Sequence, residues 1–186
     1  LDTFLKEKGI VGLYGIDTRA LTKIIRENGV MNGRITKLHP SEVSVEEIRS
    51  YRIKNAVQNV SCKETLLYRA EEPKYTVALL DFGLKENIKR ELLKRGCNVW
   101  VLPCDTSYEE VAKLKVDGIM LSNGPGDPKD NDIIIENIKE LINMHIPIFG
   151  ICLGHQLLAL ASGFDTHKLK YEHRGANQPV KDVISN

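Results

Sequence analysis

One cysteine in the second half of the chain stands in a pattern that could make it a nucleophile. Cys152 lies between Gly150 and Gly154, after a short apolar run and before an apolar helical pattern. This G-x-C-x-G spacing has the form of a nucleophile elbow, a sharp strand-to-helix turn that lifts the reactive side chain above a sheet. The flanking glycines suit such a turn because side chains there would collide with neighbouring strands. The pattern alone also permits a buried cysteine in an ordinary tight turn.

The turn would favour acyl-transfer chemistry at the sulfur of Cys152. The positive end of the following helix would point at this sulfur, which favours the thiolate form. The backbone N–H of Leu153, the next residue, would face the position where an oxyanion forms. We therefore predict a cysteine nucleophile with one oxyanion donor beside it.

A loop rich in glycine and proline is the second candidate feature. Residues 122–128 read Ser-Asn-Gly-Pro-Gly-Asp-Pro and follow another apolar run. Backbone amides of so rigid a loop can approach a ligand closely, so the loop could supply a second oxyanion donor next to Cys152. It is not a phosphate cradle, because no Gly-Lys-Ser/Thr follows it and the sequence contains no G-x-G-x-x-G. In isolation it would be interpreted as a plain loop.

The elements that position these residues follow from an alternation of patterns that begins near residue 75. Continuous apolar runs predict strands that are covered on both faces, and amphipathic segments between them predict helices. The expected strands are 76–80, 98–102, 118–121 and 146–149. Three helices are expected. The first is marked by Leu84, Ile88 and Leu92 and closed by Gly96, the second opens at a Thr106/Glu109 capping box and ends at Leu114, and the third covers 132–144. This alternation predicts an α/β fold, a parallel sheet flanked by helices with ligand sites at the carboxyl ends of its strands.

The first part of the chain has a different pattern. A well-marked amphipathic helix is expected from Asp17, which can cap its first turn, to Gly29, which tolerates a left-handed backbone. A strand over 34–38 and a short helix over 41–50 are expected after it, and 54–74 shows no clear periodicity. We interpret 54–74 as a linker between two domains.

Composition excludes several classes of function. The chain has 186 residues, of which 42% are hydrophobic and 27% are charged, as in ordinary globular proteins. Lys and Arg total 26 against 25 Asp and Glu, with no block of like charge. Nucleic acid or an anionic membrane as main partner therefore has no electrostatic support. The apolar run over 146–153 contains a proline and is too short to cross a bilayer.

The cysteines and histidines do not suggest a metal site. The four cysteines, at positions 62, 97, 104 and 152, have neither metal-ligand spacing nor the density of a secreted disulfide scaffold, so a cytoplasmic protein is expected. His167, Glu172 and His173 lack a fourth ligand at suitable spacing. We predict no metal in this chain. Cys97 and Cys104 are expected to pack as small apolar groups.

Taken together, the motifs resemble the glutaminase core of class I glutamine amidotransferases and, within that family, the small subunit of carbamoyl phosphate synthetase. The resemblance covers nearly the whole chain and rests on 150–159 (GICLGHQLLA) and 124–128 (GPGDP). Three further stretches support the narrower match: Asp81-Phe82-Gly83 with Lys85 and Asn87, 173–182, and 16–33. The last resembles the end of a separate N-terminal domain that other amidotransferases lack.

The resemblance implies a role for each matching residue. Cys152 would attack the side-chain amide of L-glutamine, form a glutamyl thioester and release ammonia. Leu153 and Gly124 would offer backbone N–H groups to the oxyanion. Gly126 and Gln156 would help to hold the glutamine.

The resemblance also implies a partner and a domain organisation. Ammonia would travel to a large synthetase subunit, which holds ATP and metal and makes carbamoyl phosphate from bicarbonate for arginine and pyrimidine synthesis. No cofactor is expected in this chain. Residues 1–53 would be the C-terminal part of the small subunit's N-terminal domain, 54–74 the linker, and 75–186 the N-terminal portion of the amidotransferase domain.

The chain departs from the family pattern in one important respect. It contains neither the His-Pro-Glu stretch that carries the family's general base nor the later Asn-His-Gly stretch of the glutamine pocket. His155, one turn into the elbow helix, is a poor substitute. Both ends look cut, since the chain opens at Leu1 and closes just after an apolar run. We therefore expect a fragment whose catalytic His and Glu lie outside it and which is inactive alone.

Three other interpretations remain open at this point. The chain could be the glutaminase of another pathway, such as anthranilate or guanylate (GMP) synthesis, although the stretch 16–33 argues against it. It could be a noncatalytic interaction module of the same fold. It could also be a thiol or ester hydrolase that does not use glutamine.

Overall fold

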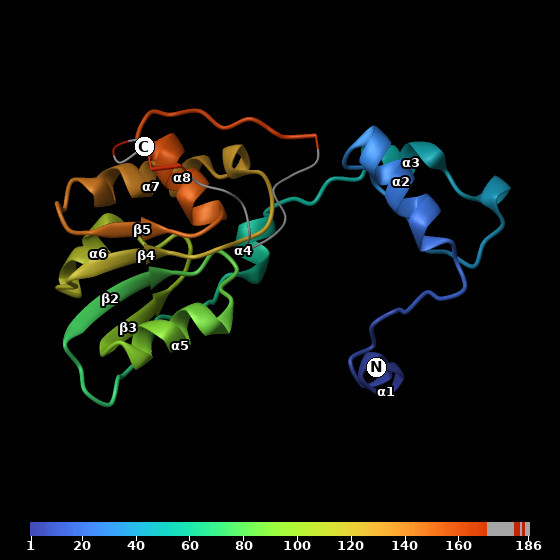
Figure 1. Cartoon of the computed structure of the whole chain (residues 1–186). Coiled ribbons are helices and arrows are strands. Elements are labelled where there is room, and N and C mark those ends of the chain that lie inside the picture. Colours follow the sequence, from blue (N-terminus) through green and yellow to red (C-terminus); the bar gives the residue numbers. More distant parts are fainter. Residues whose placement is uncertain (171–180, 183, 185–186) are drawn as a thin grey trace. The chain divides into compact units, whose positions relative to one another are not determined.

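The structure is a computed structural model in which residues 1–170, 181, 182 and 184 are described (Figure 1). The chain divides into two compact units. The larger unit comprises residues 52–167, and the smaller comprises 1–51 together with the described part of 168–186. Each unit is considered by itself below.

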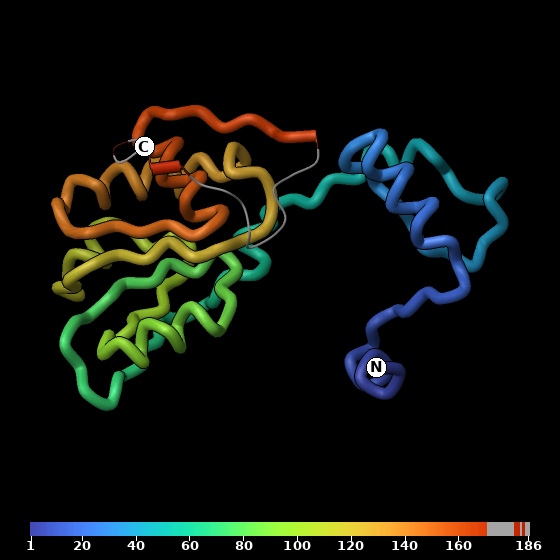
Figure 2. Tube along the Cα trace, in the orientation of Figure 1, coloured from blue at the N-terminus to red at the C-terminus, as the bar shows by residue number. Residues whose placement is uncertain are grey.

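The larger unit is built on a five-stranded sheet with the strand order β1-β3-β2-β4-β5. The strands are β1 (Leu66–Tyr68), β2 (Tyr75–Leu80), β3 (Cys97–Leu102), β4 (Gly118–Leu121) and β5 (Ile148–Gly150). All pairs are parallel except β1 with β3, and β2 lies beside β4 although about forty residues separate them (Figure 2). Leu80 pairs with Leu121, and Leu121 pairs with Gly150. The carboxyl ends of β2, β4 and β5 therefore lie level at one edge of the sheet.

Helices cover both faces of this sheet (Figure 1). They are α4 (Ala56–Val60), α5 (Glu86–Lys94), α6 (Tyr108–Lys113), α7 (Asp132–Ile142) and α8 (Leu153–Ala161), with a short 3₁₀ turn, η2 (Pro128–Asp130). Successive residues of β2 serve opposite faces, as the pleat requires. Leu80 joins the cluster under α6, α7 and α8, whereas Leu79 packs against residues of α5. The expected α/β fold, a parallel sheet flanked by helices, is confirmed.

The expected linker over 54–74 is instead part of the larger unit. Val57 in α4 is fully buried, and β1 pairs with β3 at the edge of the sheet. Five helical residues and three strand residues are too few to show a period in sequence, so the pattern looked irregular. The prediction of a linker was wrong for this physical reason.

The capping residue of α6 also differs by one position from the expected one. Ser107, not Thr106, is the N-cap, and it forms the capping box with Glu110. Both Thr106/Glu109 and Ser107/Glu110 fit the same spacing, so sequence alone could not choose between them. Thr106 instead donates its hydroxyl to the carbonyl of Pro103 at 2.8 Å.

The smaller unit contains α1 (Asp2–Glu7), α2 (Thr18–Asn28), a 3₁₀ turn η1 (Pro40–Glu42) and α3 (Val45–Ser50). The helix expected over 17–29 is confirmed as α2, because Asp17 Oδ1 accepts the N–H groups of Arg19 and Ala20 at 3.0 and 2.9 Å. The strand expected over 34–38 is absent from the described structure, where these residues form no ladder. A strand needs a partner, and the described residues of the smaller unit contain no strand that could pair with it.

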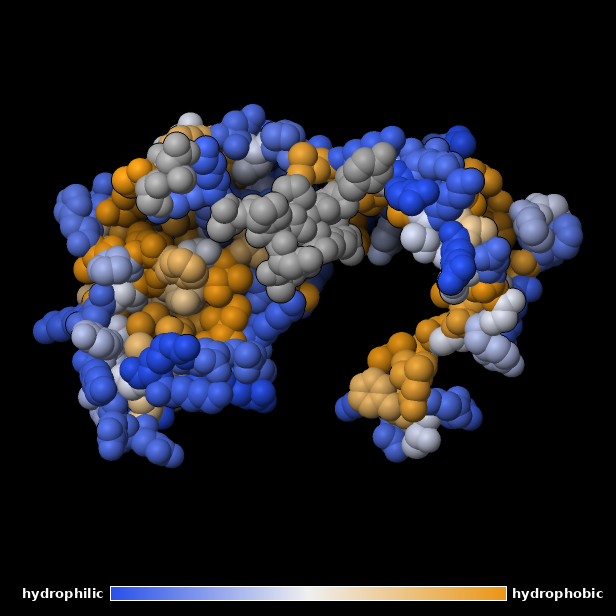
Figure 3. Space-filling view, viewed as in Figure 1, coloured by the Kyte–Doolittle hydropathy of each residue, from blue (hydrophilic) through white to orange (hydrophobic). Residues whose placement is uncertain are grey.

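Apolar side chains remain exposed on the described surface (Figure 3). None of residues 1–51 is buried. In the described part of the chain, no helix combines the length and apolar character that a membrane span requires.

Candidate active site

The structure forms the predicted elbow at Cys152. This residue follows β5 and is the N-cap of α8, with φ 54° and ψ −110°. A non-glycine residue at positive φ is uncommon and marks a backbone that its surroundings hold in place. Cys152 is exposed. The alternative of a buried cysteine in an ordinary turn is therefore excluded.

Both glycines that flank Cys152 are required by close packing. A Cβ on Gly150 would lie 2.6 Å from the backbone nitrogen of His155. A Cβ on Gly154 would lie 2.7 Å from the Cβ of Leu121 in β4. Real Cβ contacts are longer than this, so α8 can start this close to the sheet only if both positions lack a side chain.

The glycine- and proline-rich loop lies beside the elbow. A Cβ on Gly124 would lie 2.7 Å from Leu153 Cδ2 and would collide with the carbonyl group of Phe82. Leu153 is the first residue of α8, so its N–H has no acceptor within the helix. Among the described residues, the N–H groups of Leu153 and Gly124 donate to no acceptor. Two adjacent segments thus carry free amides next to the residue that bears the thiol.

A buried serine joins the loop to both neighbouring segments. Ser122 Oγ accepts the N–H of Phe82 at 2.9 Å and donates to the carbonyl of Asn123 at 2.8 Å. The Ser122 carbonyl accepts the N–H of Gly154 at 3.1 Å. The Asn123 side chain adds a second tie, because it accepts the N–H of Lys85 at 3.0 Å and donates to the carbonyl of Gly83 at 2.8 Å.

Asp81 organises the turn that follows β2. Its Oδ1 accepts the N–H groups of Gly83 and Leu84 at 2.9 and 2.8 Å, and its Oδ2 accepts the N–H of Cys62 at 2.9 Å. The sequence alone indicated no individual role for Ser122 or Asn123, and Asp81 matched the family pattern without an assigned function. The available signal was that each is a polar residue just beyond the end of a buried strand.

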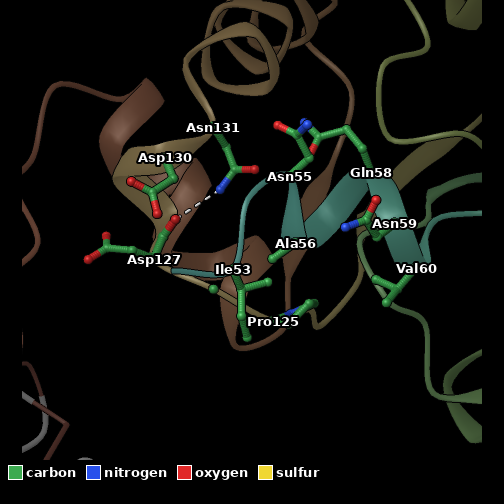
Figure 4. A pocket seen from close by; sticks show the side chains of 11 residues that line it. Ile53, Asn55, Ala56, Gln58, Asn59, Val60, Pro125, Asp127, Asp130 and Asn131 are labelled. Carbon is green, nitrogen blue, oxygen red and sulfur yellow. Dashed lines mark hydrogen bonds between the residues drawn. The ribbon is translucent and has the colours of Figure 1, made fainter. Parts of the chain in front are cut away.

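Gly126 and Gln156, both expected to hold glutamine, lie in different surroundings. Gly126 has φ +89° and lines a pocket of about 280 Å³ between α4 and the segment 125–131 (Figure 4). Asn131 on the wall of this pocket donates to the carbonyl of Asp127 at 2.9 Å (Figure 4). Neither Cys152 nor Gln156 is among the residues that line it. Gln156 is exposed on α8, where its N–H donates to the carbonyl of Cys152 at 3.1 Å.

Two of the other cysteines are held as thiols. Burial, followed by the negative charge of Asp81, raises the pKa of Cys62 to about 11. Burial also raises the pKa of Cys104, which is only 3% exposed and packs in the core as expected. Cys97 is half-buried. Exposure thus separates Cys152 from the other three thiols.

The described residues form no metal site, and His155 is the histidine that lies nearest to Cys152 along the chain. His155 is exposed in the first turn of α8. In the described part of the chain, no group of three or more His, Cys, Asp or Glu side chains could hold a metal ion. Glu172 and His173 lie outside the described residues, as does most of the family-like stretch 173–182.

Comparison with known proteins supports both parts of the resemblance. Residues 78–185 match the family model "Glutamine amidotransferase class-I", and residues 1–35 match "Carbamoyl-phosphate synthase small chain, CPSase domain". The carbamoyl phosphate synthase small chain of Bacillus thuringiensis subsp. konkukian is 49% identical over 186 residues, which are 100% of this chain and 50% of that protein. The small chain of Clostridium perfringens is 48% identical over 187 residues, covering 100% of this chain and 53% of that one.

Among solved structures, a putative GMP synthase protein from Thermoplasma acidophilum is 27% identical, with a TM-score of 0.42, and the match covers 48% of this chain and 45% of that one. The chain spans about half the length of the curated relatives it matches. The amidotransferase model covers more than half of the chain, including β4, β5 and the elbow. The chain therefore belongs to the class-I glutamine amidotransferase family.

Proposed function

We propose that this chain is the glutamine-hydrolysing part of a carbamoyl phosphate synthase small chain. The observation that carries the proposal is the exposed Cys152 at a positive-φ elbow, packed against the loop that carries Gly124. Family membership adds the substrate class, because class-I glutamine amidotransferases take nitrogen from glutamine. The match of residues 1–35 to the CPSase domain favours carbamoyl phosphate synthesis over the anthranilate and GMP pathways.

The chemistry follows from the thiol and its neighbouring amides. The Cys152 thiolate attacks the side-chain carbonyl carbon of L-glutamine, and the carbonyl oxygen becomes an oxyanion. The N–H groups of Leu153 and Gly124 stabilise this charge, and removal of one such donor typically costs about 10²–10³ in turnover. The carbon–nitrogen bond then breaks, the nitrogen takes up a proton and leaves as ammonia, and a γ-glutamyl thioester remains. Water hydrolyses the thioester to glutamate and restores the thiol.

The proton transfers need a base that we assign outside these residues. The sequence contains no His-Pro-Glu stretch, and the chain spans half the length of its relatives. We propose that the catalytic His and Glu belong to the part that it does not span. The ammonia would pass to a large synthetase subunit, where ATP and bicarbonate would complete carbamoyl phosphate. ATP, metal and bicarbonate then need no site on this chain.

Covalent labelling with 6-diazo-5-oxo-L-norleucine, a diazoketone analogue of glutamine, tests the proposal. The thiolate of Cys152 displaces nitrogen from the protonated reagent, and peptide mass spectrometry locates the adduct. We expect modification at Cys152 that disappears in Cys152→Ser and persists in the matched control Cys97→Ser. A chain that resists the diazoketone but is acylated by 4-nitrophenyl acetate would support the alternative of a hydrolase that does not use glutamine.

Release of ammonia from glutamine tests the position of the base. We expect the chain alone to be labelled at Cys152 while releasing little or no ammonia, because proton transfer typically contributes about 10²–10⁴ to the rate. Ammonia release at the rate of an intact small chain of a relative would contradict a base outside these residues.

A further inference from the structure

We infer that Ser122 is a positioning residue that sets the distance between the two oxyanion donors, the N–H groups of Gly124 and Leu153. The inference rests on the proposed function, since it concerns the same site. Ser122 touches no substrate in this role. It acts through the backbone segments that carry the two amides.

The first step of the argument is the burial of Ser122. Its side chain is 0% exposed at the carboxyl end of β4. A buried hydroxyl costs free energy unless it is hydrogen-bonded, and this one both accepts and donates. It accepts from the N–H of Phe82 at 2.9 Å and donates to the carbonyl of Asn123 at 2.8 Å. The hydroxyl therefore fixes the start of the loop against the end of β2.

The second step is the bond from the elbow to the same residue. The N–H of Gly154 donates to the Ser122 carbonyl at 3.1 Å. Gly154 directly follows Leu153, and Gly124 lies two residues after Ser122. Ser122 is thus hydrogen-bonded to the turn after β2, to the glycine- and proline-rich loop (122–128) and to the first turn of α8. No other residue in the described site is hydrogen-bonded to all three.

The third step is the tight packing of Gly124 against Phe82 and Leu153. The Cα of Gly124 lies between the carbonyl group of Phe82 and the side chain of Leu153 with no room for a methyl group. A small shift of Phe82 or of the loop therefore moves the Gly124 amide relative to the Leu153 amide. Misplacement of a catalytic group by about 1 Å can cost about 10²-fold in rate.

The variant Ser122→Ala removes the side-chain hydrogen bonds of Ser122 and leaves its backbone hydrogen bonds in place. It removes the acceptor for the Phe82 N–H and the donor to the Asn123 carbonyl, but it keeps the backbone bond from Gly154. The loop loses the bond from the Ser122 side chain to Phe82, so the Gly124 amide can shift, although the Ser122 N–H still donates to the Leu80 carbonyl and the Asn123 side chain still bonds Lys85 and Gly83. The elbow and the Cys152 thiol stay in place. Stabilisation of an oxyanion should fall, whereas the intrinsic reactivity of the thiol should not.

Two probes of Cys152 distinguish these effects. L-glutamate γ-semialdehyde forms a hemithioacetal: the sulfur bonds to the aldehyde carbon, and the thiol proton passes to the former carbonyl oxygen, which occupies the oxyanion position. Iodoacetamide alkylates the sulfur with loss of iodide and forms no oxyanion. The full chain is used, and the affinity of the aldehyde is measured by the protection that it gives Cys152 against iodoacetamide.

We expect Ser122→Ala to weaken protection by the aldehyde about 10²-fold, while the rate of alkylation without aldehyde changes less than about twofold. Ser122→Thr, which keeps the hydroxyl, should recover most of the affinity. The matched control is Ser61→Ala: Ser61 is 6% exposed, and its Oγ accepts the N–H of Cys104 at 2.9 Å, so a similar bond is lost away from the elbow. This control should lower the melting temperature but leave protection unchanged.

Equal protection in the wild type and in Ser122→Ala would overturn the inference and leave the proposed function standing. A wild-type chain that iodoacetamide alkylates but the aldehyde does not protect would overturn the proposed function and the inference together. If Ser122→Ala does not fold, Asn123→Ala carries the test, because it removes the ties to Lys85 and Gly83. Full aldehyde affinity in that variant would then contradict a loop whose position sets the oxyanion site.

Discussion

Two helices, α2 in the smaller unit and α8 in the larger, differ in how far their apolar side chains are buried. The apolar residues Leu21 and Ile24 of α2 remain 46% and 47% exposed. Leu153 and Leu157 of α8 are 1% and 0% exposed, because α8 packs onto α7 and the sheet. The caps of a helix can be recognised locally, whereas its burial depends on what the rest of the chain brings to it. The larger unit therefore offers the packed backbone that a fixed amide requires.

The largest expected effect comes from truncating matched leucines in the two units. Leu121 is 0% exposed at the end of β4, so Leu121→Ala should lower the free energy of unfolding of the larger unit by about 2–5 kcal/mol. Leu21→Ala in α2 should cost less than about 1 kcal/mol, since much of its surface already faces solvent. Urea unfolding followed by circular dichroism measures both changes. Equal losses would mean that α2 is buried by a partner in solution.

The next effect compares a glycine at the elbow with one in open space. Gly154→Ala places a methyl group against Leu121 and should destabilise the larger unit by about 1–3 kcal/mol. The displaced elbow should also slow diazoketone labelling of Cys152. Gly33→Ala, with nothing within 4 Å of the new carbon, should change stability by less than about 0.5 kcal/mol. A Gly154→Ala chain with unchanged stability and labelling would contradict the packing described for the elbow.

A smaller effect compares two helix caps. Asp17→Ala removes the acceptor for two N–H groups of α2, and Ser107→Ala removes the capping box of α6. Each should cost about 1 kcal/mol. Only Ser107→Ala should lower the unfolding midpoint of the larger unit, while Asp17→Ala should reduce helical content without moving that midpoint. A shift of the midpoint by Asp17→Ala would show that the units unfold together.

A last comparison, which involves no change in stability, sets the half-buried thiol of Cys62 against the exposed thiol of Cys152. With a pKa of about 11, Cys62 is ionised in only about one molecule in a thousand at pH 8. Its alkylation by iodoacetamide should therefore rise roughly tenfold per pH unit from pH 8 to 10. Peptide mass spectrometry of chains labelled at each pH gives the profile. Rapid labelling of Cys62 at pH 8 would mean that the shielding by burial and by Asp81 is lost in solution.

The sequence predicted those parts of the fold whose signal is local. The apolar runs of β2, β3 and β4 and the caps of α2 were sufficient to define those elements. The segment 54–74 was mistaken for a linker because α4 and β1 are too short to show a period. The strand expected over 34–38 did not form because an extended segment becomes a strand only where another strand pairs with it, and no described strand pairs with this one.

In the site, too, only the features with a local sequence signal could be predicted. The spacing around Cys152 identified the elbow because the two positions that must lack a side chain, Gly150 and Gly154, lie within five residues of each other in the sequence. The role of Ser122 could not be predicted, because its hydrogen bond to Phe82 spans forty residues and exists only when β2 and β4 are neighbours. Whether Gly126 and Gln156 hold glutamine stays a prediction, since the pocket beside Gly126 does not include Gln156.

Protection of Cys152 by L-glutamine, the proposed substrate, is the most direct test of the proposed nucleophile. The chain is treated with 6-diazo-5-oxo-L-norleucine with and without L-glutamine, and the label is located by peptide mass spectrometry. We predict that the label falls on Cys152 alone and that glutamine slows its appearance, whereas L-asparagine at the same concentration does not. Labelling spread over the other cysteines, or a rate at Cys152 that glutamine leaves unchanged, would contradict a glutamine-directed thiol at this elbow.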